Sequence, residues 1–122
     1  MKNVFLISTL LLVSLMMLTS FSSRTKNGFL PTSLKVNVLD ELGNVVQGCE
    51  VTLYGTKEDY QAEENPIMSQ LTDKHGKTVF KKVKPTAYYV HATFGEKNNM
   101  GSGVLTQVLQ EGHTNKVNTI ID

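Results

Sequence analysis

From residue 34 onward, apolar and polar residues alternate in short runs separated by turn-forming residues. Residues 34–39 read LKVNVL and residues 49–54 read CEVTLY, so every second position is apolar in both. A period of two places alternate side chains on the same face, as in a strand that is buried on one side. The pattern therefore predicts two strands, with a turn containing Gly and Asn at residues 40–44.

The rest of the chain predicts further strands and little helix. The polar stretch 56–66 is expected to form a loop or a single helical turn, and Pro85 is expected to end a strand because proline has no backbone donor. Further strands are predicted at residues 67–72, 77–83, 87–94, 104–110 and 116–121, the last two forming a final hairpin. About seven short strands with regular turns predict an all-β fold of two packed antiparallel sheets.

Residues 1–23 have the order of segments found in a signal peptide. A basic start with Lys2 precedes an apolar run at residues 4–18 and a tail of small residues, which predicts cleavage near Ser22 or Ser23. No cysteine lies directly after the apolar run, so a lipid anchor is not indicated. We expect a secreted or periplasmic chain without a stable membrane span, made of a polar segment at 24–33 and one domain at 34–122. The alternative is an uncleaved leader that serves as an anchor.

The mature chain is expected to be electrically balanced. The full sequence has 12 Lys and Arg against 11 Asp and Glu, and removal of Lys2 with the leader makes the two numbers equal. Because no global positive field would attract a polyanion of this kind, the charge balance argues against nucleic acid as a partner.

Cys49 is the only cysteine of the chain, so an internal disulfide is excluded. It shares a strand face with Val51 and Leu53, which favours a buried thiol that behaves as a small apolar side chain. The alternative is a thiol that pairs between two chains.

A spaced set of residues between positions 34 and 94 carries a family resemblance. The set comprises LKVNV from residue 34, Gly43, VQGCEVTL from residue 46, TDKHG from residue 72, Phe80, VKP from residue 83 and YYV from residue 88. It resembles the carboxypeptidase regulatory-like domains, whose Ig-like, prealbumin-like (transthyretin-like) sandwich is related to the collagen-adhesin B-type repeats. Two positions depart from the family: Cys49 replaces the usual Ala, and Thr86 and Ala87 follow Pro85 where Gly is usual.

The resemblance implies a scaffold and not an activity, because such domains mostly serve as spacers, binding modules or folding supports. We therefore expect a non-enzymatic, exported module with a binding or structural role at the cell envelope and without a cofactor. The alternative is a small hydrolase or metal-dependent enzyme on the same sandwich, using some of His75, Tyr89 and His91.

The spacing of the histidines argues against a metal site. His75 and His113 are expected in turns and His91 on the solvent side of a strand, and neither H-x-x-x-H nor C-x-x-C occurs. Tyr89 and His91 share a strand face, which leaves open an iron site of the kind found in the related intradiol dioxygenases. The Tyr-Arg-Gly-Ser ending of the transthyretin-like hydroxyisourate hydrolases is absent from the sequence.

The collagen-adhesin repeats often carry a Lys-to-Asn isopeptide bond, which the resemblance extends to Lys35 on the first strand and Asn118 on the last. Lys35 alternates with Leu34 and Val36, so a solvated lysine is favoured over the buried, reactive lysine that such a bond requires.

Lysines crowd the predicted central hairpin, whereas acidic residues crowd the stretch 56–66. The candidate binding surface comprises Lys74, His75, Lys77, Lys81, Lys82, Lys84, Tyr89 and His91. Such a bipolar surface would bind an envelope protein or an anionic glycan, or associate weakly with itself. The alternative is a monomer whose lysines protect an exposed strand from aggregation.

Overall fold

The computed structural model describes residues 30–122, so the predicted signal peptide at 1–23 and the segment 24–29 lie outside the described residues. Residues Pro31–Asp122 form one compact unit. Within the described part of the chain, no helix is both long and apolar enough to cross a bilayer.

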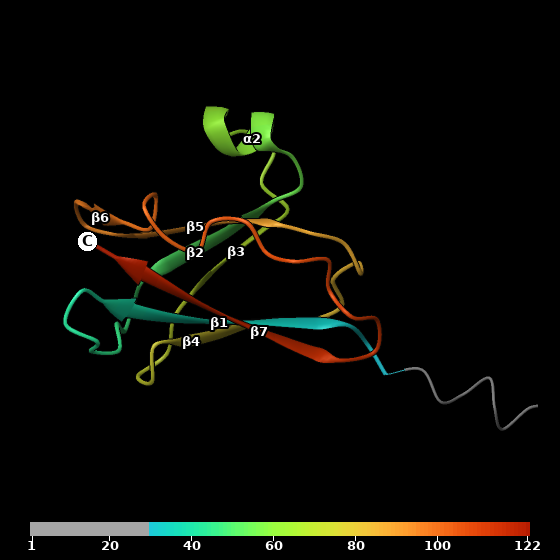
Figure 1. The fold of residues 1–122 in the computed structure, drawn as a ribbon, viewed down its shortest axis with the longest axis horizontal. Helices are drawn as coiled ribbons and strands as arrows, with labels where there is room; N and C mark the ends of the chain where they lie inside the picture. The colour runs from blue at the N-terminus through green and yellow to red at the C-terminus, as the bar shows by residue number, and fades with distance from the viewer. Residues whose placement is uncertain (1–29) are drawn as a thin grey trace, which may run out of the picture. The chain divides into compact units, whose positions relative to one another are not determined.

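Seven strands form two stacked sheets, with one short helix beside them (Figure 1). Sheet A has the order β4-β1-β7, with β4 at Lys77–Phe80, β1 at Ser33–Asp40 and β7 at Thr114–Ile121. Sheet B has the order β3-β2-β5-β6, at Met68–Leu71, Glu50–Tyr54, Tyr89–Phe94 and Lys97–Asn98. The prediction of an all-β sandwich of about seven strands is confirmed.

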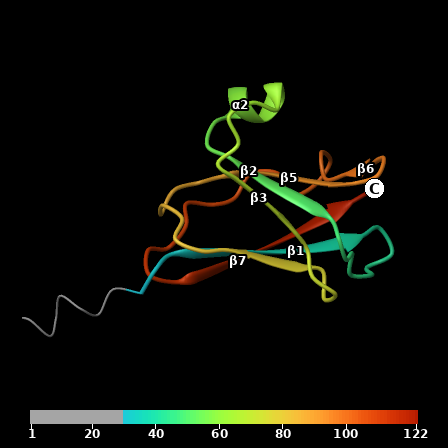
Figure 2. The ribbon, with the colours of Figure 1, turned by 180° about the vertical axis from the view of Figure 1, so that it is seen from behind.

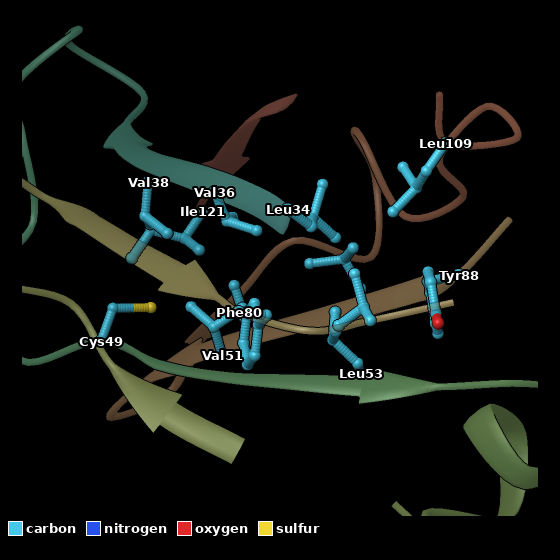
Figure 3. Close-up of a cluster of buried hydrophobic side chains, with 13 residues drawn as sticks. Leu34, Val36, Val38, Cys49, Val51, Leu53, Phe80, Tyr88, Leu109 and Ile121 are labelled. Carbon is cyan, nitrogen blue, oxygen red and sulfur yellow. The ribbon is translucent and has the colours of Figure 1, made fainter. Parts of the chain in front are cut away.

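The core lies between the two sheets and is built from the alternate positions that the sequence pattern marks as apolar (Figure 3). Strand β1 points every second side chain inward because its backbone is extended. The buried cluster comprises Leu34, Val36, Val38, Cys49, Val51, Leu53, Phe80, Val83, Tyr88, Val90, Ala92, Leu109 and Ile121.

The thiol of Cys49 belongs to this core, which confirms the expectation of a buried cysteine. Its Sγ lies 3.4 Å from the carbonyl oxygen of Thr93, to which the thiol donates. Burial raises the pKa of the Cys49 thiol to about 11, because the thiolate would lose its hydration.

Strands β1 and β7 are parallel, in register from Ser33 opposite Thr114 to Asp40 opposite Ile121. This differs from the expectation that all strands would be antiparallel. The physical reason is the route of the chain: β7 follows a long connection from sheet B and enters sheet A at the same end as β1.

The expected final hairpin between residues 104–110 and 116–121 does not form. Residues 104–106 instead bond to sheet B: the N–H of Val90 donates to the carbonyl of Val104 at 2.6 Å, and the N–H of Thr106 to the carbonyl of Tyr88 at 2.9 Å. The hairpin prediction was wrong because these long-range bonds satisfy the segment, while β7 pairs with β1.

The polar stretch 56–66 contains helix α2 at Lys57–Ala62, which confirms the interpretation as a helical turn. Thr56 caps the helix, since its Oγ1 accepts the N–H of Asp59 at 3.1 Å. The helix ends at Glu63, which has a left-handed φ of 53°. Both views show α2 on the outer side of sheet B (Figures 1 and 2), where it contacts β2 and β5.

Candidate functional site

Three separate places hold seven of the eight residues of the candidate binding surface, and Lys77 lies apart from them on the outer face of sheet A. The first is the turn between β3 and β4, which carries Lys74 and His75. Asp73 shapes this turn, because its Oδ1 accepts the N–H of Lys77 at 3.0 Å and that of His75 at 2.8 Å. These two hydrogen bonds hold the pKa of the Asp73 carboxyl below its usual value.

The second place is the segment that follows β4, where Lys81, Lys82 and Lys84 are exposed. The side chain of Tyr88 is hydrogen-bonded to the backbone of this segment. Its Oη accepts the N–H of Lys84 at 2.9 Å and donates to the carbonyl of Lys84 at 3.1 Å. The tyrosine therefore has a structural part in the loop, and the three lysines remain free at the surface.

The third place is the outer side of sheet B, where Tyr89 and His91 lie under helix α2. The ring of Tyr60 stacks on that of Tyr89, with 5.7 Å between the ring centroids, and meets His91 edge-on, also at 5.7 Å between centroids. The centroids of Tyr54 and Tyr60 lie 6.0 Å apart. The side chain of His91 is only 14% exposed, so the expectation that it faces solvent was wrong. Its Nδ1 lies 3.6 Å from Oε1 of Glu63, the residue that ends α2.

This aromatic cluster, Tyr54, Tyr60, Tyr89 and His91, holds the helix against the sheet. Burial raises the pKa of Tyr54 and of Tyr60, and the carboxylate of Glu63 adds to both shifts. Sequence reasoning missed Tyr60, although a single aromatic residue inside the polar stretch 56–66 is a signal for docking.

The three residues of the enzymatic alternative are thus divided between two places, with His75 in a turn and Tyr89 and His91 beneath α2. Across residues 30–122, no three His, Cys, Asp or Glu side chains are grouped as ligands of one metal ion. His113 precedes β7 in an exposed turn, where its carbonyl accepts the N–H of Ser33 at 3.0 Å.

Three cations lie on the outer face of sheet A. Lys77, Lys35 and Lys116 belong to the adjacent strands β4, β1 and β7, and their side chains share the outward face; we call them the lysine face. Lys35 is directly opposite Lys116. None of the three forms an ion pair within 4.0 Å with another described residue. Sequence reasoning missed Lys116, whose partner strand could not be read from a local pattern.

Two amides share this face. Asn37 is opposite both Lys77 and Asn118, and its Nδ2 donates to Oδ1 of Asn118 at 2.8 Å. Asn118 lies two register positions from Lys35 on the neighbouring strand, with Asn37 as its direct partner. An isopeptide bond between Lys35 and Asn118 stays a prediction, which an intact-mass measurement tests through the loss of one ammonia.

A groove runs between β7 and the segment 103–110, the two segments that were expected to pair as a hairpin. Its cavity volume is about 480 Å³. Leu105 and Val108 contribute exposed apolar side chains, and Lys116, Val117 and Asn118 contribute the wall formed by β7. The size lies in the range of about 300 to 1,000 Å³ that is common for ligand pockets.

No family model and no curated protein matches the chain. Solved structures do share its fold. The Bacillus anthracis TIE protein matches with a TM-score of 0.54 and 13% identity over 76% of this chain and 16% of its own. A variant of the shaft pilin SpaA from Lactobacillus rhamnosus GG matches with a TM-score of 0.52 and 11% identity over 75% of this chain and 47% of its own. The chain thus spans less than half the length of either protein, and at these identities the likeness concerns the sandwich fold.

Proposed function

We propose that the protein is an exported, non-catalytic module of the cell envelope that binds an anionic glycan through the lysine face. The observation that carries the proposal is the register, which places Lys35 directly opposite Lys116 and Lys77 two residues further along, all on one open sheet face. The likeness of the sandwich to that of a shaft pilin supports a location at the envelope and a non-catalytic role.

The spacing of the lysine face suits a polymer with repeated negative charges. Neighbouring strands lie about 4.8 Å apart, so the backbones that carry the three lysines span about 10 Å across the sheet. Asn118 adds an exposed amide two residues from Lys116 on the same face, which can hydrogen-bond to sugar hydroxyls. Cations that are not neutralised by neighbouring acids attract a polyanion from a distance.

Protection against aggregation accounts for part of this face and not for all of it. Lys77 and Lys116 lie on β4 and β7, the two edge strands of sheet A, where lysine discourages pairing with another chain. Lys35, however, lies on β1, the central strand, which has no free edge to protect. A lysine at this position is better explained by a ligand over the face of the sheet.

The test is retention on immobilised chondroitin sulfate, with neutral dextran as the uncharged comparison. We expect the native protein to be retained at about 50 mM salt and released at about 500 mM, because salt screens exposed charges. The double variant Lys35→Glu with Lys77→Glu is expected to lose retention.

Lys57→Glu is the matched control, since Lys57 is an exposed lysine in the first turn of α2 on the outer side of sheet B. It repeats one of the two Lys→Glu charge changes at a place where acidic residues are favourable. Equal loss of retention in the control, or no retention of the native protein on the polyanion, would contradict the proposal.

A further inference from the structure

Strand β7 forms one edge of sheet A, and its backbone groups alternate between β1 and the free side. The carbonyl of His113 accepts the N–H of Ser33, so the odd-numbered residues of β7 direct their N–H and C=O groups toward β1. The even-numbered residues Lys116 and Asn118 therefore direct theirs outward. Within residues 30–122 these outward backbone groups have no hydrogen-bond partner.

The open part of this edge is short because both of its ends are closed. At one end the amide of Asn115 accepts the N–H of Gln110 at 2.8 Å and donates to its carbonyl at 3.2 Å, as a strand backbone would. At the other end Oγ1 of Thr119 donates to the carbonyl of Ser102 at 2.9 Å. Gly103 reaches the carbonyl of Asn118 so closely that a Cβ there would lie 2.9 Å from it.

Between these ends lies the groove described above, and its wall combines three kinds of contact. The backbone of Lys116 offers an unpaired N–H and an unpaired C=O, and Asn118 offers an N–H. Across the groove, Leu105 is 58% and Val108 71% exposed, which is high for aliphatic side chains. Lys116 supplies one positive charge, and none of the residues that line the groove is acidic.

We propose that this groove binds an extended segment of a partner polypeptide, which adds to sheet A as a short strand beside β7. The unpaired backbone groups of Lys116 and Asn118 require a ligand that has both donors and acceptors at strand spacing, and a peptide backbone has them. The charge of Lys116 selects a segment with an acidic residue, and Leu105 and Val108 select an apolar side chain next to it.

A second copy of the chain fits this edge less well. Pairing of β7 with β7 within so short an opening would bring the two Lys116 side chains together, and like charges in neighbouring strands are destabilising. The charge of the groove thus favours a different, acidic partner.

The experiment selects displayed random heptapeptides on the full native protein and counter-selects on Lys116→Pro. Proline at position 116 removes an N–H that points to the free edge and leaves the ladder with β1 intact. Lys116→Ala is the matched control, since it removes the charge and keeps the N–H. We expect enriched peptides with an acidic residue beside an apolar one, binding Lys116→Pro at least about tenfold more weakly and Lys116→Ala at intermediate strength.

A synthetic copy of the strongest peptide locates the contact without any substitution. In a titration followed by amide NMR of the native protein, the signals of Lys116 and Asn118 should shift and their hydrogen exchange should slow. N-methylation of the peptide at its central residue should abolish both effects. Three results would overturn the proposal: no enriched peptide, shifts that lie elsewhere, or protection of these amides that grows with protein concentration in the absence of peptide and so assigns the edge to a second copy.

Discussion

Asn99 is fully buried, yet its amide joins the two sheets. Its Oδ1 accepts the N–H of Ala92 at 3.0 Å, and its Nδ2 donates to the carbonyl of Val90 at 2.9 Å and to Oγ1 of Thr119 at 3.0 Å. Val90 and Ala92 belong to sheet B, whereas Thr119 belongs to sheet A. One polar side chain thus provides hydrogen-bond partners for the backbone of β5 beyond the end of the neighbouring strand β6.

Replacement of Asn99 by Ala should lower the free energy of unfolding by about 2 to 4 kcal/mol, because it leaves buried backbone groups of β5 unpaired. Urea denaturation measures the change. Asn98→Ala is the control: this neighbouring amide is half-buried and accepts only the N–H of Met100, so a loss of less than about 1 kcal/mol is expected. Similar losses in both variants would show that the Asn99 bridge adds nothing.

The raised pKa of Cys49, about 11 against an ordinary value of 9.0, makes stability fall in alkaline solution. Above pH 9.0 the thiol of the unfolded chain ionises while the folded chain keeps it protonated. Ionisation therefore stabilises the unfolded state relative to the folded state. At pH 10 the loss is on the order of 1 kcal/mol. The measurement is the free energy of unfolding of the native protein and of Cys49→Ala from pH 8 to 10. The difference between the two curves cancels the contribution of other groups. Parallel curves would refute the buried thiol.

At the scale of the elements, helix α2 depends on a single aromatic residue. None of its residues is fully buried, and Tyr60 alone carries it onto Tyr54, Tyr89 and His91. A helix of 6 residues is too short to be stable by itself, so its order derives from this docking and from the Thr56 cap.

Tyr60→Ala is therefore expected to release α2 and leave the sandwich folded. The half-buried ring contributes about 1 kcal/mol, and its loss should raise amide hydrogen exchange at Lys57–Ala62 while β1 and β7 keep their protection. Gln61→Ala, an exposed position in the same helix, should leave the exchange unchanged. If the strands lose protection together with the helix, α2 is part of the cooperative core and not an attached element.

For the whole molecule, the sequence pattern was sufficient where neighbours along the chain decide the structure. The alternation around Leu34 and Val51 defined strands and core, and Asp73 with Gly76 defined a turn, because these depend on strand period and turn chemistry. The pairing of β7 with β1 was not predictable, since residues about 80 positions apart make it and several antiparallel arrangements fit the same alternation.

Which candidate residues share a surface was not predictable for the same reason. Lys77 and Lys35 were both named from the sequence, but their meeting with Lys116 required the strand order of sheet A. Tyr89 and His91 were placed on one strand face correctly, yet the helix that covers this face comes from a stretch with little apolar content. Local chemistry identified side chains, and the long-range topology decided which of them share a surface.

The parallel register of β1 and β7 has a mechanical consequence. Ser33 begins one strand and Ile121 ends the other, so these two positions lie at opposite ends of a ladder of eight paired positions. Tension applied at Ser33 and Ile121 shears the ladder, whereas tension at Ser33 and Thr114, which are neighbours, opens it one bond at a time. Single-molecule pulling should give the higher rupture force in the first geometry, and equal forces would contradict this. Under load along the chain, the terminal strand pair would then act as a force clamp, with the ladder bonds and not the apolar core setting the force at which the domain yields.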